Sequence, residues 1–305
     1  MPPSINTKNM NSKSSILAII SAFSCSLLFL PNIALSEDVN KLIAEEMLGR
    51  NESVTIPQGT FEIESSLIYQ ESDKSDLFGT DVSRALSVPL TLRYAAKKGL
   101  LIWVTAPFQY SAREIPLDNT TENLTTSGLG DISFGAIYQL LQEGSSQPGV
   151  MFTLSGKADN GKITDATNTN HLSIGNGYWR TGGSINITRT FEPLLTFANI
   201  GYDYNFQKTK DGVVTKPGNT FNLSSGVIFS ITNDVALRMQ GDFSYVSRSR
   251  EDGSPIGSIT TPAVLTFALG KSIGNWWYLE PGISRGLSKS SPDYALFING
   301  VMRWH

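Results

Sequence analysis

The sequence predicts an all-β protein: a transmembrane antiparallel up-and-down β-barrel of about 12 strands, with a short N-terminal periplasmic helix before it. Three observations predict this fold. They are a secretory leader, a strict alternation of short and long connections between strand candidates, and a last strand whose apolar face ends in an aromatic residue. Because every backbone N–H and C=O group needs a partner in lipid, strands can cross a membrane only as a closed barrel.

Residues 1–36 have the composition of a secretory signal peptide. They contain lysine but no acidic residue, and an apolar stretch at 16–30 is followed by a small-residue exit at Ala34-Leu35-Ser36. This stretch is too short for a comfortable spanning helix, so we expect cleavage near Ser36. The single cysteine, Cys25, lies in the leader. The mature chain therefore has no disulfide and no thiolate metal site.

The mature chain is acidic. Lys8 and Lys13 belong to the leader, so 22 of the chain's 24 lysine and arginine residues remain against all 27 aspartate and glutamate residues. This balance argues against nucleic acid as a partner.

Residues 37–59 form a leader segment before the barrel, with a short amphipathic helix predicted at 38–50. The apolar residues that recur at the spacing of one helix face are Val39, Leu42, Ile43 and Met47. Such a helix could plug the barrel mouth, bind a periplasmic partner, or be only a frayed leader.

Residues 60–305 are predicted to form the barrel. The strand candidates are 60–70, 85–95, 100–111, 131–141, 149–157, 178–189, 194–206, 219–231, 234–247, 259–271, 275–286 and 293–304. In the ninth candidate, the apolar Leu237 and Met239 alternate with the polar Arg238 and Gln240. This pattern is typical of a membrane strand with an apolar outer face, although a soluble strand that buries its apolar face has the same alternation.

The connections favour the membrane alternative. Those after every second strand are short, such as 96–99 and 232–233. The connections after the first, third, fifth, seventh and ninth candidates are long and polar, at 71–84, 112–130, 158–177, 207–218 and 248–258, and the one after the eleventh is of moderate length. Short periplasmic turns and long extracellular loops are the signature of a meander barrel in the bacterial (Gram-negative) outer membrane. An even number of strands then places both termini in the periplasm.

The last strand carries its apolar or small residues on one face, which ends in Trp304. We predict that Trp304 faces lipid and acts as the terminal aromatic of the signal that the barrel-assembly machinery reads, with His305 as an overhang. Taken alone, the same strand could close a soluble sandwich.

Several short motifs between residues 57 and 162 carry a family resemblance. They are Pro57-Gln58-Gly59-Thr60-Phe61-Glu62-Ile63, Leu90-Thr91-Leu92-Arg93-Tyr94, Ala106-Pro107-Phe108 with Tyr110, and Gly128-Leu129-Gly130-Asp131-Ile132-Ser133-Phe134-Gly135 with Tyr138. On these residues the chain resembles the outer-membrane barrel family named for the meta-cleavage pathway of phenol degradation. It departs from the family pattern at 95–99 and 159–162, as a distant member would. The resemblance implies an outer-membrane barrel that moves small, aromatic or hydrophobic molecules, and it offers no catalytic residues to carry over.

Function is expected in the lumen, where strand parity places a nearly balanced set of charges. The candidate lumen-lining residues are Glu62, Glu64, Arg93, Asp131, Arg180, Arg238, Asp242, Glu280 and Arg303. They could orient a small solute, or they could form an ion-pair network that fills and stabilises a narrow barrel. Barrels of about eight strands are filled by side chains and those of about 16 leave a water channel, so both alternatives are physically possible for an intermediate size.

We therefore expect an outer-membrane channel for small solutes, with a structural or surface-interaction barrel as the alternative. Lipid hydrolysis is a distant third, because the only histidines are His171, in a polar loop, and His305, at the chain end. Neither would lie beside a nucleophile on the lipid-facing surface. We predict no enzyme activity, no cofactor and no metal site, and we expect lipid, the assembly machinery and small solutes as partners.

Overall fold

The computed structural model describes Met47 and residues 57–76, 79–117, 120–161, 173–210, 212–274 and 276–304. The predicted signal peptide and His305 lie outside the described residues, and so does the predicted leader helix except for Met47. No helix in the described part of the chain is long and apolar enough to cross a membrane.

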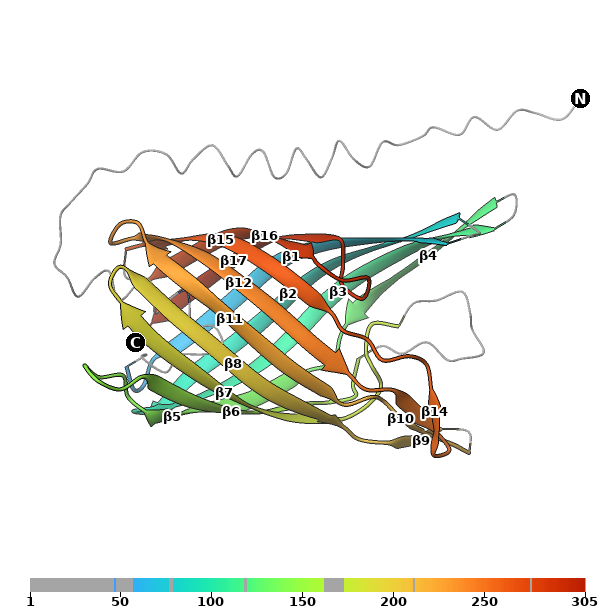
Figure 1. Cartoon of the computed structure of the whole chain (residues 1–305), viewed down its shortest axis with the longest axis horizontal. Coiled ribbons are helices and arrows are strands. Elements are labelled where there is room, and N and C mark those ends of the chain that lie inside the picture. The colour runs from blue at the N-terminus through green and yellow to red at the C-terminus, as the bar shows by residue number, and fades with distance from the viewer. Residues whose placement is uncertain are drawn as a thin grey trace, which may run out of the picture. The chain divides into compact units, whose positions relative to one another are not determined.

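The predicted antiparallel barrel of twelve strands is confirmed (Figure 1). The ring consists of β1 (Phe61–Asp76), β2 (Gly79–Lys97), β3 (Leu100–Leu117), β5 (Ser133–Leu141), β6 (Gly149–Lys157), β7 (Arg180–Phe191), β8 (Leu194–Asn205), β11 (Thr220–Ser230), β12 (Val235–Val246), β15 (Ala263–Ile273), β16 (Trp277–Gly286) and β17 (Tyr294–Trp304). Each strand pairs with its neighbour in the chain, and β1 closes the ring by pairing with β17 from Phe61↔Trp304 to Glu71↔Tyr294.

The alternating side chains point their apolar members outward. On β12, Leu237, Met239 and Phe243 are exposed, whereas Ala236 on the opposite face is fully buried. A soluble sandwich would bury these large apolar side chains. An outer surface of this kind instead requires lipid around it, because contiguous exposed apolar area is unfavourable in water.

Most of the predicted long loops are partly strands, which corrects the sequence analysis. β1 and β2 stay paired as far as Asp76↔Gly79. The remaining extra strands are β4 (Thr120–Leu129), which pairs with the far half of β3, and β9 (Lys208–Lys210), β10 (Val213–Lys216), β13 (Ser249–Glu251) and β14 (Ser254–Ile256), which form a separate four-stranded sheet. Beyond the lipid both faces of a strand meet water. The apolar alternation that marks a strand therefore ends, while the backbone hydrogen bonds continue.

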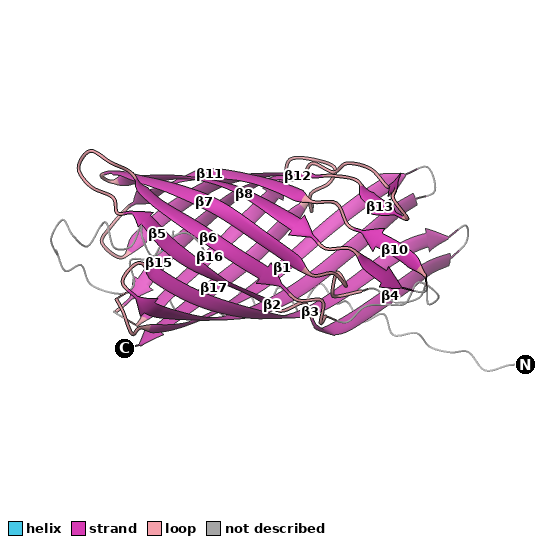
Figure 2. Cartoon of the chain, turned by 90° about the horizontal axis from the view of Figure 1, so that it is seen from below, coloured by secondary structure: helices cyan, strands magenta, loops and turns pink. Residues whose placement is uncertain are grey.

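The two ends of the barrel differ. We call the end with Phe61 and Trp304 the short-turn end, and the end where the extra strands project the long-loop end (Figure 2). β5 and β6 are only nine residues long, so β3 pairs with β5 from Leu100 to Thr105 and with β4 from Phe108 to Leu117. Residues 158–161 and 173–179, which follow β6 and precede β7, contain no strand.

Candidate functional site

The inner wall of the barrel carries the charges that strand parity selected. Of the nine candidate residues, Glu62, Glu64, Arg93, Asp131 and Glu280 are buried, and Arg180, Arg238, Asp242 and Arg303 are half-buried. In a barrel whose outer face is exposed, these side chains lie on the inner face. They form separate clusters rather than one continuous ring.

The first cluster lies at the short-turn end, where β2, β1 and β17 are neighbours. Glu62 is the register partner of both Arg93 and Arg303. Arg303 donates from Nε to Glu62 Oε1 at 2.7 Å, and Arg93 Nη1 lies 3.6 Å from Glu62 Oε2. Arg93 also donates from Nη2 to Glu64 Oε2. Two cations and two carboxylates thus neutralise one another across three strands.

The second cluster surrounds Glu280 on β16. Its Oε1 accepts from Arg238 Nη2 at 2.7 Å and from Asn299 Nδ2 at 3.3 Å, while Tyr278 donates its hydroxyl to Oε2 at 2.6 Å. Arg238 reaches Glu280 from β12, across β15, where its register partner is the small Ala268. A residue of small volume at this position lets the guanidinium span two strand spacings.

The second cluster continues along β12. Arg238 Nη1 donates to Gln240 Oε1 at 2.7 Å, and Gln240 Nε2 donates to Asp242 Oδ1 at 2.7 Å. Asp242 is absent from the ion pairs formed within the described part of the chain. Because this section of the inner wall holds the Glu280 and Asp242 carboxylates beside the Arg238 guanidinium, it carries an excess of negative charge.

Asp131 has a different environment from the one predicted, because β5 begins only at Ser133. Its carboxylate accepts from Lys157 Nζ at 2.7 Å, from the Gly161 N–H at 2.9 Å and from the Asn176 N–H at 2.8 Å. Asp131 therefore ties both described ends of the connection between β6 and β7 to the top of β5. This arrangement positions a loop rather than presenting a free charge to the lumen.

Sequence reasoning missed the partners of several of these charges. Arg180 Nη1 lies 3.6 Å from Oδ2 of Asp203 on β8, and neither Asp203 nor Lys157 was among the candidates. Both residues share the inward parity of their strands, so the alternation contained the signal.

Apolar side chains occupy much of the inner wall at the short-turn end, which was also not predicted. Met47 is only 2 % exposed and belongs to a cluster of buried residues on five strands. The other members of this cluster are Leu195, Phe197, Ile228, Ala236, Tyr278 and Val301. A second cluster contains Leu101, Ile137 and Met151, with Trp103 packed against it.

Inward-facing glycines let aromatic rings lie along the wall. Ring atoms of Trp103 occupy the space that a Cβ at Gly135 would need, at 2.8 Å, and the Phe197 ring does the same at Gly226, at 2.6 Å. Phe297 lies over Gly282 in the same way. Because no side chain projects at these glycines, the rings form part of the wall itself.

Among the residues that the structure describes, three polar groups of the inner wall are buried without a hydrogen-bond partner. They are both amide atoms of Asn186, Nε1 of Trp103 and Nε of Arg238. Unpaired buried polar groups are rare in native proteins, and each costs about 1–3 kcal/mol. Within the described residues, no group of three or more histidine, cysteine, aspartate or glutamate side chains could hold a metal ion.

A closed barrel with an apolar outer surface and a charged inner wall is the architecture of an outer-membrane β-barrel protein, and the comparisons with known proteins agree. Residues 48–304 match the model of the family described as putative MetA-pathway of phenol degradation, and the chain belongs to that family. The resemblance noted in the sequence is therefore confirmed over most of the chain.

Two solved structures share the fold. An outer membrane channel from Pseudomonas putida F1 superposes with a TM-score of 0.68 at 12% sequence identity, covering 84% of this chain and 98% of that one. The translocator domain of the autotransporter NalP from Neisseria meningitidis gives a TM-score of 0.51 at 10% identity, covering 88% and 100%. At such low identities these likenesses establish the fold alone.

Proposed function

We propose that this protein is an outer-membrane channel for small solutes, in particular aromatic or hydrophobic ones. The observation that carries the proposal is the mixed inner wall: atoms of the Trp103, Phe197 and Phe297 rings fill the space over Gly135, Gly226 and Gly282, beside charged and amide side chains. A wall with aromatic faces and few polar groups suits a planar solute that carries one or two polar atoms. Membership of a family described by phenol degradation, and a fold shared with an outer membrane channel, support the same function.

The unpartnered groups on the wall supply polar contacts for such a solute. The Asn186 amide offers an NH2 group with two N–H donors and a carbonyl acceptor, and Trp103 offers an N–H donor beside its own ring. A hydroxyl or carbonyl group on a small ring would satisfy either residue. Because both groups are buried in this structure, we propose that they contact the solute when the side chains that cover them move aside, whereas the charges of the first cluster fix the wall around it.

The size limit of the channel would be set at the short-turn end. Met47 packs against Leu195, Phe197 and Tyr278 on the inner wall and so occupies lumen volume there. We propose that this packing excludes solutes much larger than a single ring. The prediction of a leader helix at 38–50 would place further chain in the same region.

Solute flux into liposomes tests the function directly. Proteoliposomes with the mature barrel should take up phenol-sized aromatic solutes faster than protein-free liposomes, and should exclude disaccharides in a swelling assay. Replacing Asn186 with leucine should slow the aromatic flux without loss of the folded barrel. Equal flux with and without the protein, in vesicles that contain folded barrel, would contradict the proposal.

The alternative, a structural barrel without transport, is favoured by one observation: the Arg93, Glu62 and Glu280 side chains are almost fully buried and paired. Planar bilayers separate the two functions, since a closed barrel gives no conductance steps and a channel does. The absence of enzyme activity stays a prediction.

We also propose that both termini lie in the periplasm and that Trp304 belongs to the assembly signal. Trp304 is paired in register with Phe61, and the two rings stack with centroids 6.1 Å apart at the short-turn end. Trp304→Ala should lower the amount of heat-modifiable barrel in outer-membrane fractions, with Trp276→Ala as the control for losing an exposed tryptophan near the same end. Unchanged yield would make Trp304 an ordinary packing residue.

A further inference from the structure

Two cations face each other on the outer side of the four-stranded sheet at the long-loop end. Lys216 on β10 is the direct register partner of Arg250 on β13. Like charges directly opposite each other on antiparallel strands are destabilising. Within the described part of the chain, neither Lys216 nor Arg250 forms an ion pair with a carboxylate.

The described acidic residues next to Arg250 in the sequence, Glu251 and Asp252, are not placed to neutralise this pair. Glu251 follows Arg250, so its side chain points to the opposite face of the sheet, where Thr215 is its register partner. Asp252 holds the turn, because its Oδ1 accepts from the Val214 N–H at 2.9 Å. An anion from outside the chain would remove the repulsion between Lys216 and Arg250.

The surroundings of Lys216 indicate which kind of anion would bind here. Its Nζ lies 4.4 Å from the centroid of the Tyr204 ring and donates to the Tyr204 hydroxyl at 3.1 Å. The outward residues of β8 run from Leu194 and Ile200 to Tyr202 and then Tyr204, all exposed. On the surface of a membrane protein, apolar residues contact the hydrocarbon, tyrosines lie at the interface, and cations bind the anionic head groups. The outer face of β8 and Lys216 follow this order.

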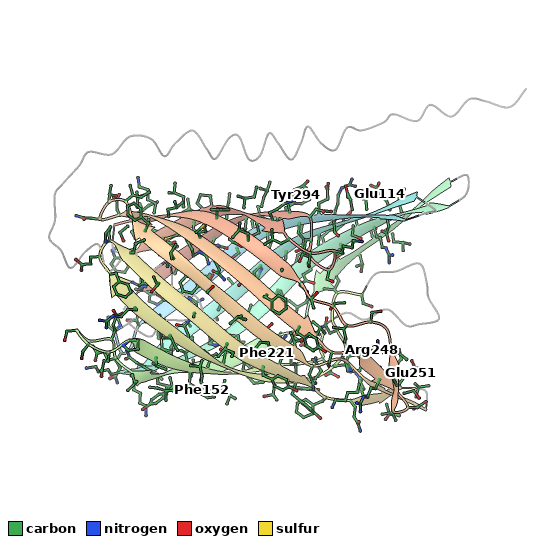
Figure 3. All side chains as sticks on the ribbon, in the orientation of Figure 1. Glu114, Phe152, Phe221, Arg248, Glu251 and Tyr294 are labelled. Carbon is green, nitrogen blue, oxygen red and sulfur yellow. The ribbon has the colours of Figure 1, made fainter. Side chains whose placement is uncertain are left out.

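The same outer face extends to the next strand of the barrel. Phe221 on β11 is the register partner of Tyr202, and it lies on the barrel wall to the left of the ribbon that carries Arg248 and Glu251 (Figure 3). The connections that form this sheet, 207–218 and 248–258, contain five basic and three acidic residues. The connections 71–84 and 112–130, at the same end, contain three basic and seven acidic residues. Among these four connections, the excess of basic residues therefore lies with the four-stranded sheet.

We propose that Tyr202, Tyr204, Lys216 and Arg250 form a lipid-phosphate patch, which binds the phosphate of a phosphorylated, acylated glycolipid of the outer leaflet. The guanidinium of Arg250 and the two remaining N–H donors of Lys216 bind the phosphate oxygens. The tyrosine rings contact the sugar and the start of the acyl chains. The location of the patch in the outer leaflet rests on the proposed orientation of the barrel, whereas its chemistry does not.

Binding of bisphosphorylated lipid A to the mature barrel in neutral detergent, followed by native mass spectrometry, tests the patch. The double variant Lys216→Gln with Arg250→Gln should bind about tenfold more weakly than the unaltered barrel, because two cations near an anionic head group are lost. Lys97→Gln with Lys98→Gln is the matched control, since it removes two exposed lysines at the short-turn end. This control should bind as the unaltered barrel does.

Three further arms sharpen the test. Phosphatidylethanolamine should bind equally to the unaltered barrel and to the variants. Inorganic phosphate should not displace lipid A, because the patch needs the acylated sugar as well as the phosphate. Arg250→Glu should raise the thermal stability of the lipid-free barrel, by placing a carboxylate opposite Lys216, and should weaken lipid A binding. Heat-modifiable mobility verifies that each variant is folded.

Equal lipid A binding by the unaltered barrel and the Lys216/Arg250 variant would overturn the proposal. Equal losses in the Lys97/Lys98 control, or full displacement by inorganic phosphate, would also overturn it. No arm measures solute transport. A barrel that binds lipid A but takes up no aromatic solute would therefore refute the proposed channel and leave the lipid-phosphate patch intact.

Discussion

Arg84 and Arg93 lie on the same strand, β2, and each faces two carboxylates of neighbouring strands. Arg93 contacts Glu62 and Glu64 inside the barrel. Arg84 lies nearer the long-loop end, and it contacts Glu71 at 3.1 Å and Glu114 at 2.5 Å. The Arg93 side chain is 4% exposed and the Arg84 side chain is 34% exposed. Chemically equivalent ion pairs thus differ in the dielectric around them.

The difference matters because water screens the outer pairs and not the inner ones. An exposed ion pair contributes about 0–1 kcal/mol to stability. Breaking a buried pair by removing one member costs about 3–5 kcal/mol, since the remaining charge is left without compensation in a medium of low dielectric. The inner pairs should therefore maintain the barrel, whereas the outer ones mainly keep the projecting strands soluble.

Arg93→Met should have the largest effect. It leaves Glu64 without its guanidinium partner and Glu62 with Arg303 alone, so the free energy of unfolding should fall by about 3–5 kcal/mol. Urea unfolding of the detergent-solubilised barrel, followed by tryptophan fluorescence, measures this change. A loss below about 1 kcal/mol would mean that water reaches the first cluster and that the inner and outer pairs are equivalent.

Glu280→Gln should have the second largest effect. The amide keeps a hydrogen-bond acceptor for Arg238 but removes the buried charge, so we expect a loss of about 1.5–3 kcal/mol, the contribution of hydrogen bonds to charged groups. Glu114→Gln is the matched control, because it makes the same substitution in the partly exposed partner of Arg84. Equal unfolding midpoints for the two variants would contradict the expected difference between buried and exposed ion pairs.

Asp242→Asn separates charge from stability on the inner wall. Asp242 accepts a hydrogen bond from Gln240 and has no ion pair among the described residues, so its neutralisation should change stability by less than about 1 kcal/mol. In planar bilayers the reversal potential should shift toward anions, since a fixed charge in a low-dielectric pore controls which ions enter. Arg238→Gln should shift it the other way. An unchanged reversal potential in both conducting variants would exclude this section of wall from the ion path.

Arg84→Met should have the smallest effect. The free energy of unfolding should fall by less than about 1 kcal/mol at low salt, and this loss should vanish at high salt. The same urea unfolding assay, run at two salt concentrations beside Arg93→Met, checks this prediction. A large and salt-independent loss would mean that the projecting strands are part of the cooperative unit of the barrel.

Parity alone placed Glu62, Arg93, Glu280 and Arg303 on one face of their strands, and the structure buries or half-buries all four. The partners of these residues were not predicted, because a partner depends on the register between strands that are distant in sequence. Glu62 and Arg303, for example, are 241 positions apart and meet only when β1 closes on β17. Asp131 was predicted to begin a strand, whereas it anchors a loop. Its role depends on Gly161 and Asn176, which no local pattern connects to it.

The sequence by itself determined the class of structure: residues that alternate with period two and connections that alternate in length indicate a barrel, because lipid tolerates no unpaired backbone. The secretory leader stays a prediction. The sequence also determined which face of each strand is apolar. Only the tertiary structure decided which charges neutralise one another, that the polar connections continue as paired strands, that Met47 lies against the inner wall, and that Lys216 and Arg250 face each other. These features depend on ring closure and strand register, which are properties of the whole sheet rather than of any one segment.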